Sequence, residues 1–480
     1  MENKITRALR DELLASKVAK KGSLTARDRI ESLFDEGTFT EIGAFTSRRI
    51  SEFDQKSPDE FESVICGYGS IDDRLVYAFA EDMSRTKGSI SEASAKKICS
   101  VYRLAVENGC PVVAILDSAG AYLPEGVRAL AGYGSIMKAV ATASGIIPQI
   151  AVVPGVATGA GAIIASMFDF VIATENCEIS VNPPFVVGGG KSDNSVESGV
   201  ASVVVKTDAD ALSTARKLLA YLPSNNEEGT VELNCTDDAN RETSLSAYEA
   251  DGKIASLISE VADCGEFFEL NAGYAPSVKT GFVSLGGTVC GVIANDHSEN
   301  CGKLSSKGAR KAARFLSFCD CFSVPVITLV DSDGFEVSGD EEKNPYCSEI
   351  GKLAGAYASA KTALVTLVCG TAYGSVFSLF GSKAIGADIV FALESAKVAC
   401  LNPKSAVALL RNNKISAKMT REMLEEEWAE NDANIANAAK AGEIDDIIDA
   451  AEVRQRLASA VNMLACKAGA PRRRHANMPL

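Results

Sequence analysis

The chain has 480 residues, of which 46% are hydrophobic and 23% charged. This composition is typical of a globular protein with large buried cores, and the length predicts two to four domains of roughly 100–200 residues each. The net charge of −15 makes nucleic acids and anionic membranes poor general partners, because so acidic a surface repels them. The chain opens without an apolar signal segment, and no run reaches the ~18 apolar residues of a membrane helix. We therefore expect a cytoplasmic protein.

The chain contains 14 cysteines, none of which form a Cys-x-x-Cys pair, and the nearest two are Cys319 and Cys321. Cysteines scattered in this way indicate reduced thiols rather than a disulfide frame or a zinc site, so we expect no metal. Histidine is the commonest general acid or base, yet only His297 and His475 occur. A mechanism that depends on a histidine relay would have to use one of these two residues.

The predicted elements begin with a helix and a short segment in residues 1–50. A β-rich run then leads into a helix and an uninterrupted apolar strand, and two more apolar strands flank a glycine-bearing turn and a helix of small residues. These expected elements are, in chain order, residues 75–80, 91–108, 112–116, 149–153 and 170–173. Continuous apolar strands are typical of strands buried on both faces of a sheet.

A polar stretch, residues 223–250, follows this pattern and is predicted to be a linker. The second half of the chain then repeats the order of β-rich run, helix and three apolar strands. These elements are residues 289–294, 305–322, 326–330, 364–368 and 389–392. After Thr420 the chain is charged and helical, and it ends with a basic cluster at 471–475 that is typical of a solvated terminus or of a contact with an acidic neighbour.

An internal repeat relates the two halves. The strand that begins at Pro111 matches the strand that begins at Pro325, 214 positions later. Upstream matches keep this offset, and downstream it grows slowly, reaching 215 between Gly159 and Gly374. An ordered series of matches with a drifting offset indicates a duplication. The sequence therefore predicts an α/β fold of two tandem domains with similar structures.

The glycines at the two strand-to-helix turns, Gly159 and Gly374, suggest the chemistry. A helix N-terminus offers unpaired N–H groups and the positive end of the helix dipole, and glycine lets the backbone turn sharply toward a ligand. Two N–H groups directed at one oxygen form an oxyanion hole, in which losing one donor costs about 3 kcal/mol of transition-state stabilisation. The alternative is that these glycines serve only the close packing of helix on strand.

Two other patterns carry less weight. The run Gly-Gly-Gly-Lys-Ser at 188–192 lacks the first glycine of a phosphate-binding loop, because that position holds Phe185. The serines near the ends of the repeated strands, Ser118 and Ser332, have no histidine nearby in the sequence, so a serine hydrolase is not favoured.

Longer motifs are more specific. They are Leu-Thr-Ala-Arg-Asp-Arg-Ile at 24–30, Asp-Glu-Gly-Thr-Phe at 35–39, Glu-Gly-Val at 125–127, Leu-Ala-Gly-Tyr-Gly at 130–134, Gly-Ile-Ile-Pro-Gln-Ile at 145–150, Lys-Ala-Ala-Arg-Phe at 311–315 and His-Ala-Asn-Met-Pro-Leu at 475–480. With these motifs the chain resembles, over nearly its whole length, the carboxyltransferase (β) subunits of propionyl-CoA carboxylase. It is similar also to the α subunits of methylmalonyl-CoA and glutaconyl-CoA decarboxylases.

The resemblance implies two tandem crotonase-like domains. The N-terminal domain, residues 1–225, would bind the acyl-CoA, and the C-terminal domain, residues 245–480, would bind biotin. It also implies a homo-oligomer, a dimer or a hexamer, in which the N-terminal domain of one subunit faces the C-terminal domain of another.

The same resemblance assigns the site residues. The first oxyanion hole, for the thioester enolate, falls on Gly159 and Ala160, and the second, for the ureido oxygen of biotin, falls on Ser375 and Val376. The implied acyl-CoA site comprises Ala119, Gly120, Ala121 and Tyr122, and the implied biotin site comprises Gly334, Phe335, Tyr373 and Gly374. Such chemistry needs no side-chain base, because the biotin nitrogen can exchange a proton with the substrate carbon, which suits a chain so poor in histidine.

Several positions depart from the family pattern. The family's Gly-Gly pair is Gly159-Ala160 here, and its Gly-Ala pair is Ser375-Val376. A β-branched residue keeps its backbone donor in place only at negative φ. The other departures are Tyr122 in place of arginine, Asn194 in place of histidine, residues 182–188 in place of Thr-Gly-Pro-Asp-Val-Val-Lys, and Ser348, Glu349 and Ile350 in place of Arg-His-Gly.

We therefore predict a biotin-dependent carboxyltransferase that acts on a short acyl-CoA, propionyl-CoA or methylmalonyl-CoA. The chain has no Met-Lys-Met biotinylation motif and no ATP-binding loop, so a biotin carboxyl carrier protein and either biotin carboxylase or sodium-pump decarboxylase subunits would be separate polypeptides. With pump subunits, the protein would dock at the inner membrane face. Two alternatives remain open. One is a non-catalytic scaffold subunit, favoured by Ser375 and Val376, and the other is a biotin-independent crotonase-like hydratase, isomerase or thioesterase with Glu125 as its base.

Overall fold

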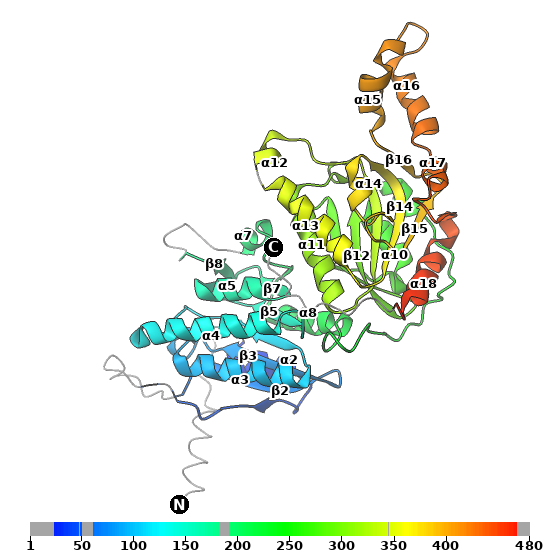
Figure 1. The fold of residues 1–480 in the computed structure, drawn as a ribbon. Helices are drawn as coiled ribbons and strands as arrows, with labels where there is room; N and C mark the ends of the chain where they lie inside the picture. Colours follow the sequence, from blue (N-terminus) through cyan, green and yellow to red (C-terminus); the bar gives the residue numbers. More distant parts are fainter. Residues whose placement is uncertain (1–23, 48, 50–60, 183–191, 344, 468–480) are drawn as a thin grey trace, which may run out of the picture. The chain divides into compact units, whose positions relative to one another are not determined.

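The computed structural model describes residues 24–47, 49, 61–182, 192–343 and 345–467 (Figure 1). The chain divides into two compact units, and the division falls between Glu228 and Gly229. Three expectations concern residues outside the described ranges. They are those for the first 23 residues, for most of the Gly-Gly-Gly-Lys-Ser run and for the basic end. Among the described residues, no helix combines the length and the apolar character needed to cross a bilayer.

A mixed sheet forms the centre of the first unit. Among its described residues the strand order is β1-β2-β3-β4-β5-β7-β9, with antiparallel pairs from β1 to β3 and parallel pairs from β3 onward. These strands are β1 (Thr40–Glu41), β2 (Val64–Ile71), β3 (Arg74–Glu81), β4 (Val112–Ile115), β5 (Gln149–Val153), β7 (Phe170–Thr174) and β9 (Val203–Val205). A separate parallel pair joins β6 (Val156–Thr158), which directly precedes helix α5, to β8 (Glu178–Ser180), which follows β7 in the chain.

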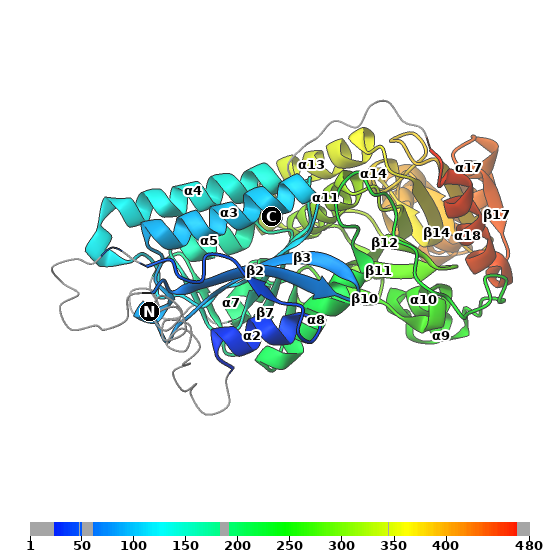
Figure 2. The same cartoon turned by 90° about the horizontal axis from the view of Figure 1, so that it is seen from below.

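Helices pack on this sheet, and α3 and α4 run side by side (Figure 2). The helices of the unit are α2 (Ala26–Leu33), α3 (Glu92–Asn108), α4 (Val127–Ala143), α5 (Ala160–Met167), α7 (Ser192–Glu197) and α8 (Asp208–Tyr221). Local signals set the bounds of α3. The side chain of Ser91 accepts the Ser94 N–H at its start, and Gly109 adopts the left-handed conformation at its end.

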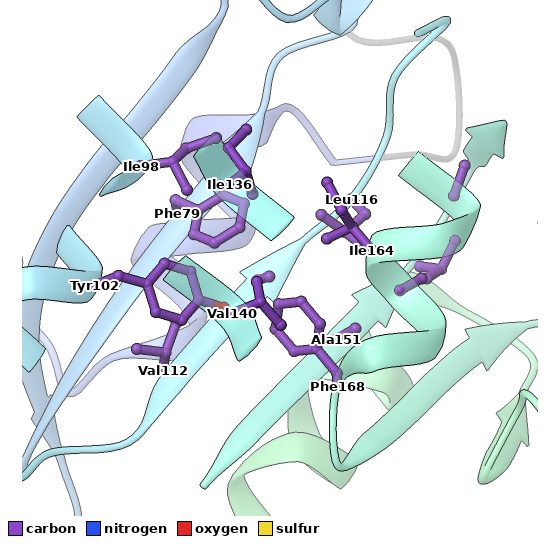
Figure 3. Packing of buried hydrophobic residues seen from close by; sticks show 14 of the residues in the cluster. Phe79, Ile98, Tyr102, Val112, Leu116, Ile136, Val140, Ala151, Ile164 and Phe168 are labelled. Carbon is purple, nitrogen blue, oxygen red and sulfur yellow. The ribbon is translucent and has the colours of Figure 1, made fainter. Parts of the chain in front are cut away.

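The core of the first unit lies between the sheet and its helices. Figure 3 shows side chains of β3, α3, α4 and β5 pointing toward one another, among them Phe79, Tyr102 and Val140. The rings of Phe79 and Tyr102 lie 6.3 Å apart in a tilted arrangement. Phe168, which follows α5, is fully buried, and burying a side chain of this size contributes about 1.5–3 kcal/mol. This packing fixes the start of α5, where the chemistry is expected.

The second unit repeats this arrangement. Its described sheet has the order β10-β11-β12-β13-β14-β15-β17, and β16 pairs with the end of β14. The strands are β10 (Phe268–Leu270), β11 (Val278–Leu285), β12 (Thr288–Asn295), β13 (Val326–Ser332), β14 (Leu364–Tyr373), β15 (Ile389–Leu393), β16 (Lys397–Ala399) and β17 (Asp446–Ile448). Here β14 continues without a break through the segment that corresponds to β6, so that β14 with β16 takes the place of the separate β6–β8 pair.

The second unit also has additional helices after its last apolar strand. Figure 1 shows α15 and α16 standing away from the sheet of this unit. The described helices of the whole second unit are α9 (Ser246–Asp251), α10 (Ile254–Val261), α11 (Ser306–Cys321), α12 (Gly339–Lys343), α13 (Tyr346–Ser359), α14 (Ser375–Leu379), α15 (Pro403–Ala406), α16 (Arg421–Glu427), α17 (Ile435–Lys440) and α18 (Val453–Leu464).

Strand registers support the duplication. Tyr77 pairs with Val112 in the first unit, and Gly291 pairs with Val326 in the second, so both partners shift by the same 214 positions. Helix starts agree as well, because the side chain of Ser305 accepts the Gly308 N–H as Ser91 does in α3. The predicted fold class, an α/β protein of two similar tandem domains, is confirmed.

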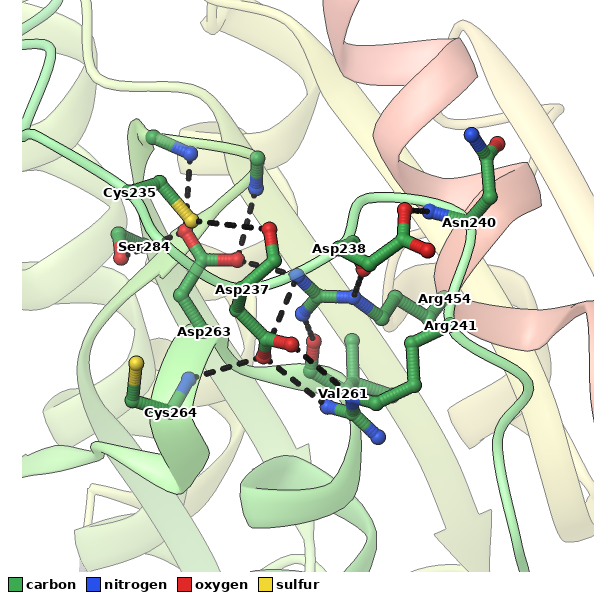
Figure 4. Close-up of polar contacts among 12 residues, drawn as sticks. Cys235, Asp237, Asp238, Asn240, Arg241, Val261, Asp263, Cys264, Ser284 and Arg454 are labelled. Carbon is green, nitrogen blue, oxygen red and sulfur yellow. Dashed lines mark hydrogen bonds and ion pairs between the residues drawn. The ribbon is translucent and has the colours of Figure 1, made fainter.

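The polar stretch expected to be a linker packs instead against the second unit from Gly229 onward. Figure 4 shows Arg454 of α18 at the centre of this contact. Its fully buried guanidinium donates to the carbonyls of Asp238 and Val261 and to the carboxylate of Asp263, and its backbone N–H donates to Thr243. Sequence composition indicates a linker here because the segment is polar, but its backbone carbonyls serve as acceptors for a buried cation.

Asp263 is the acidic partner in this contact. Burial alone would raise its pKa, but hydrogen bonds from the Gly287 and Gly286 N–H groups, Arg454 and Ser284 lower the pKa to about 2. A carboxylate with a lowered pKa stabilises the fold above its unfolded-state pKa, and the contribution is lost as the pH falls through the folded-state value.

We expect Arg454→Met to destabilise the protein by about 3–5 kcal/mol, because it leaves the buried Asp263 carboxylate without its cation. The loss of stability between pH 3.8 and about 2 should also become shallower than in the wild type. Urea unfolding at several pH values measures both effects. Arg456→Met is the matched control, since Arg456 lies on the same helix in a half-exposed pair with Glu452 and should change stability by about 0–1 kcal/mol. Equal effects of the two variants would contradict this interpretation.

Candidate active site

A buried carboxylate follows the corresponding central strand in each unit. Asp117 comes just after β4 and accepts the Val156 N–H at 3.1 Å, and Asp331 of β13 accepts the Thr371 N–H at 2.8 Å. Each carboxylate thereby holds the segment that leads to a strand-to-helix turn. The residue before each donating N–H is glycine, Gly155 or Gly370, and a Cβ added there would lie 2.2 Å from the carboxylate oxygen. The close approach therefore requires glycine.

The two carboxylates have different counter-ions. Arg29 of α2 lies 2.8 Å from Asp117, and Asp117 also donates its N–H to Glu81, whose pKa burial raises to about 8. In the second unit, Tyr248 donates to Asp331, and the Nδ1 atom of His297 lies 3.2 Å from an Asp331 oxygen. The His297 contact is close enough for an ion pair but does not have the angle of a well-formed hydrogen bond.

The hydroxyl groups of the two serines at the ends of the central strands accept hydrogen bonds within their own loops. Ser118 Oγ accepts the Gly120 N–H at 3.0 Å, and Ser332 Oγ accepts the Gly334 N–H at 3.2 Å. Gly120 and Gly334 adopt φ values of 108° and 116°, which side chains rarely tolerate. These serines stabilise the loops, in keeping with the argument against a serine hydrolase.

The loop and the turn are adjacent within each unit. Ser118 pairs with Ala157, which brings the predicted acyl-CoA loop 119–122 alongside the turn at Gly159. In this loop Ala119 is exposed and Tyr122 is buried.

The second unit repeats the contact between loop and turn. Ser332 pairs with Ala372, and a Cβ on Gly334 would lie 3.4 Å from the Tyr373 carbonyl. Phe335 is held by pairing with Leu304. The structure thus gathers the predicted residues of each half-site within one unit.

Gly159 and Gly374 shape the turns but do not donate their own N–H groups to a ligand. They adopt φ values of 58° and 69°, and their N–H groups donate to the carbonyls of Ser180 and Ala399, each at 2.9 Å. The next residue, Ala160 or Ser375, begins the helix, so its N–H has no intrahelical acceptor. The donors that remain for a ligand are those of the first helical residues.

The substitution of Ser375 and Val376 for the family's Gly-Ala pair leaves this geometry intact. Both residues lie in the first turn of α14, where φ is negative, and the positive φ falls on Gly374. The Val376 side chain is fully buried, whereas Ser375 is exposed. The β-branched residue therefore occupies a conformation that it tolerates well, and its N–H keeps its direction.

A pocket of about 500 Å³ opens beside the turn of the second unit. Its lining residues are Gly374, Ser375, Phe377, Ser378, Val398, Ala399, Cys400, Trp428, Asp432, Ala438 and Glu443. The Nε1–H of Trp428 is buried without a hydrogen-bond partner, and the Arg411 guanidinium lies 5.1 Å from its ring. Sequence analysis missed this wall of the site. A single tryptophan in the charged C-terminal region is the one signal that could have pointed to it.

Among the remaining predicted residues, Glu125 and Glu349 make structural contacts, and Asn194 and Ser348 lie in helices. Glu125 accepts the Glu92 N–H at 2.6 Å at the start of α3, and Glu341 caps α11 in the same way through Ser306. Asn194 lies in α7. Ser348 and Glu349 lie in the first turn of α13, where the buried Glu349 contacts Arg310 and Lys352. Burial would raise the pKa of Glu349, but the hydrogen bonds from these two cations lower it. His475 lies outside the described residues.

Comparisons with known proteins agree with one another. Residues 17–478 match the carboxyl transferase domain family. The chain is 34% identical over 487 residues to the carboxyltransferase subunit of a propionyl-CoA carboxylase from Haloferax mediterranei, with 96% of this chain and 94% of that protein covered. It is 34% identical over 486 residues to subunit alpha of methylmalonyl-CoA decarboxylase from Propionigenium modestum, with the same 96% and 94% coverage.

A solved structure shares the fold. The transcarboxylase 12S structure, described as a hexamer assembly with hydrolysed methylmalonyl-coenzyme A bound, superposes with a TM-score of 0.90. The sequence identity is 31%, and the match covers 95% of this chain and 93% of that one.

We expect Gly374→Ala to destabilise the protein by about 1–3 kcal/mol, because alanine must adopt the positive φ of the turn. Ser375→Ala, at the next position, should change stability by less than about 0.5 kcal/mol, because Ser375 is exposed and helical. Denaturant unfolding of the two variants measures the difference. A larger effect at Ser375 would show that the strained residue has been misidentified.

Proposed function

The chain belongs to the carboxyl transferase family, and on this basis we propose that it moves a carboxyl group between biotin on a carrier protein and a short acyl-CoA. Propionyl-CoA and methylmalonyl-CoA are the proposed substrates, since the relatives named above act on these thioesters. The observation that supports the proposal most strongly is the pair of glycine turns in equivalent places, each opening a helix with an N–H that has no intrahelical acceptor.

The first unit is proposed to bind the acyl-CoA. The loop 119–122 lies beside the turn, so a thioester held against it would place its oxygen near the N–H of Ala160. This donor would stabilise the negative charge that develops on the oxygen as the α-proton leaves. A second transcarboxylase 12S structure, with methylmalonyl-coenzyme A and methylmalonic acid bound, supports a CoA ester as the ligand.

The second unit is proposed to bind biotin. The pocket beside Gly374 has room for a compact polar ring, and its lining includes Trp428 and the exposed Ser375. Carrier-bound carboxybiotin would supply the carboxyl group, and its ring nitrogen would accept the α-proton. The chain would contribute the N–H groups of Ser375 and Val376, which donate toward the ureido oxygen. No side chain would need to act as a base.

Partners follow from this chemistry. A biotin carboxyl carrier protein must deliver the ring, and either biotin carboxylase or sodium-pump decarboxylase subunits must complete the reaction cycle. We also propose a homo-oligomer, a dimer or hexamer in which half-sites of different subunits meet. The hexamer assembly of transcarboxylase 12S supports this.

The two alternative functions are less well supported. A non-catalytic scaffold was suggested by Ser375 and Val376, but the glycine turn before them keeps the donors in place. A hydratase or isomerase would need Glu125 as a free base, yet this carboxylate caps α3, and Glu341 does the same for α11.

The first test is transcarboxylation by the purified full-length protein. Incubation with free biotin or biocytin and methylmalonyl-CoA or malonyl-CoA should consume the thioester in a biotin-dependent manner, which chromatography can follow. Loss of thioester without biotin would favour a CoA-ester hydrolase, and no loss in a folded, oligomeric sample would favour the scaffold.

We expect Gly159→Val to reduce transfer about 10²–10³-fold, because valine at a φ of 58° must move the turn and with it the Ala160 donor. Gly159→Ala strains the turn less and should give a smaller loss in the same direction. Gly134→Ala is the control, since Gly134 is exposed in the middle of α4 with open space around it, and should keep full activity. Retained activity in a folded Gly159→Val variant would contradict the oxyanion assignment.

Glu125→Gln should leave transfer within about threefold of wild type, because glutamine can still accept the Glu92 N–H and no proton moves through this side chain. The initial rate of methylmalonyl-CoA consumption measures this effect. A loss of 10²-fold or more with unchanged stability would instead identify Glu125 as a general base.

A further inference from the structure

Three side chains with different donor atoms cluster beside the proposed biotin half-site. The ligand atoms of His297, Cys301 and Asp333 all lie within 4.8 Å of one another. His297 and Asp333 are half-buried, and Cys301 is exposed. All three belong to the second unit, and Asp333 directly precedes Gly334 of the proposed biotin loop.

The fold brings these residues together through two neighbouring turns. Cys301 lies in a short 3-10 turn, Asn300–Gly302, where it adopts a φ of 53°. Asp333 follows β13, and its N–H donates to the Cys301 carbonyl at 3.0 Å. His297 lies shortly before the 3-10 turn, just after β12. The backbone thus holds the three residues on one side of the strand ends.

The first unit shows that the fold itself does not need these side chains. The equivalent positions, 214 residues earlier, carry Met83, Lys87 and Ala119. The backbone of the turn is nevertheless the same, since Lys87 has a φ of 56° and Cys301 a φ of 53°. The second unit therefore carries histidine, cysteine and aspartate at three positions where the first unit, with the same backbone turn, has no comparable set of ligands.

A simpler explanation covers only part of the cluster. His297 lies 3.2 Å from Asp331 and serves as its counter-ion, as Arg29 does for Asp117 in the first unit. This role accounts for the histidine, and Asp333 Oδ1 accepts the Thr371 hydroxyl at 3.0 Å, but neither contact accounts for Cys301. The histidine contact is also the usual arrangement at metal sites, where a ligating histidine directs one ring nitrogen at a carboxylate and the other at the metal. With Nδ1 facing Asp331, Nε2 of His297 is the nitrogen left for an ion.

We propose that His297, Cys301 and Asp333 bind a divalent transition-metal ion of the zinc type. Imidazole, thiolate and carboxylate are the ligands that zinc prefers, and three protein ligands leave a fourth position for water or a ligand. Such ligands lie about 2.0–2.3 Å from the ion, so the side chains must rotate inward from their present spacing, which the exposed Cys301 allows. Binding releases the thiol proton to solvent.

This inference departs from the expectation, based on cysteine spacing, that the protein uses no metal. That expectation failed to consider ligands on different strand ends, since Asp333 is 32 positions from Cys301 in the chain. The proposed ion would join the 3-10 turn to the loop before Gly334. The inference does not rest on carboxyl transfer, because metal binding is measured without any reaction.

The test uses Co²⁺ as a probe with the full-length protein after chelator treatment. A Co²⁺–thiolate bond gives an intense charge-transfer band in the near ultraviolet, so titration reports both stoichiometry and affinity. We expect one Co²⁺ per chain in the wild type, competed away by Zn²⁺. Cys301→Ser should abolish the band, and Asp333→Ala should weaken Co²⁺ binding at least tenfold. Both variants should keep their fold, because the first unit folds with other residues at these positions.

Cys264→Ser is the matched control for adventitious thiol binding. Cys264 is also exposed and also adopts a φ of 53° in a 3-10 turn, so it reproduces the thiol and backbone of Cys301, but among the described residues it belongs to no cluster of metal-ligating side chains. Its band should equal that of the wild type. The proposal is overturned if the wild type gives no band, if the band survives in Cys301→Ser or disappears in Cys264→Ser, or if Asp333→Ala binds Co²⁺ normally.

Discussion

The buried carboxylates Asp117 and Asp331 are the constraint on which each half-site depends. Each accepts a backbone N–H from the extended segment that leads into the strand-to-helix turn and so fixes where that segment turns into a helix. The approach is so close that only Gly155 or Gly370 fits beside the carboxylate. The N–H groups at the start of the helix belong to the backbone, so a change of side chain there, such as Ser375 and Val376, leaves them in the first helical turn.

The two units show how one architecture diverges after duplication. Strand registers, helix caps and glycine turns coincide, whereas the groups around the two carboxylates differ. Arg29 and Glu81 surround Asp117, but Tyr248 and His297 surround Asp331. The backbone was thus preserved while the side chains beneath each turn changed. Such divergence is what the proposed binding of two chemically different ligands by the two units would require.

Much of this arrangement was predictable from the sequence. Uninterrupted apolar runs marked the central strands, and the 214-residue offset marked the duplication, because both patterns reflect burial in a shared backbone. Gly159 and Gly374 were predictable as turn residues since positive φ selects glycine. That their own N–H groups pair with Ser180 and Ala399 was not predictable, because this contact depends on strand pairing rather than on local sequence.

Contacts between distant segments were beyond sequence reasoning for the same reason. Trp428 lines the pocket, although composition assigns it to a charged tail. The buried Arg454 contacts a segment that composition assigns to a polar linker. A polar residue is expected to be exposed as long as its partner is unknown. The partners of Arg454 lie about 190–215 positions away in the chain. The structure supplies the pairing that makes burial of the guanidinium possible.

The position of Arg454 also affects how the protein is made. Synthesis proceeds from the N-terminus. The carbonyls of Asp238 and Val261 and the carboxylate of Asp263 therefore leave the ribosome long before Arg454 of α18 can donate to them. The second unit therefore completes its fold only after α18 has been synthesised, whereas the first unit can mature earlier. A chain that stops short of α18 would lack the guanidinium that pairs with the buried Asp263 carboxylate.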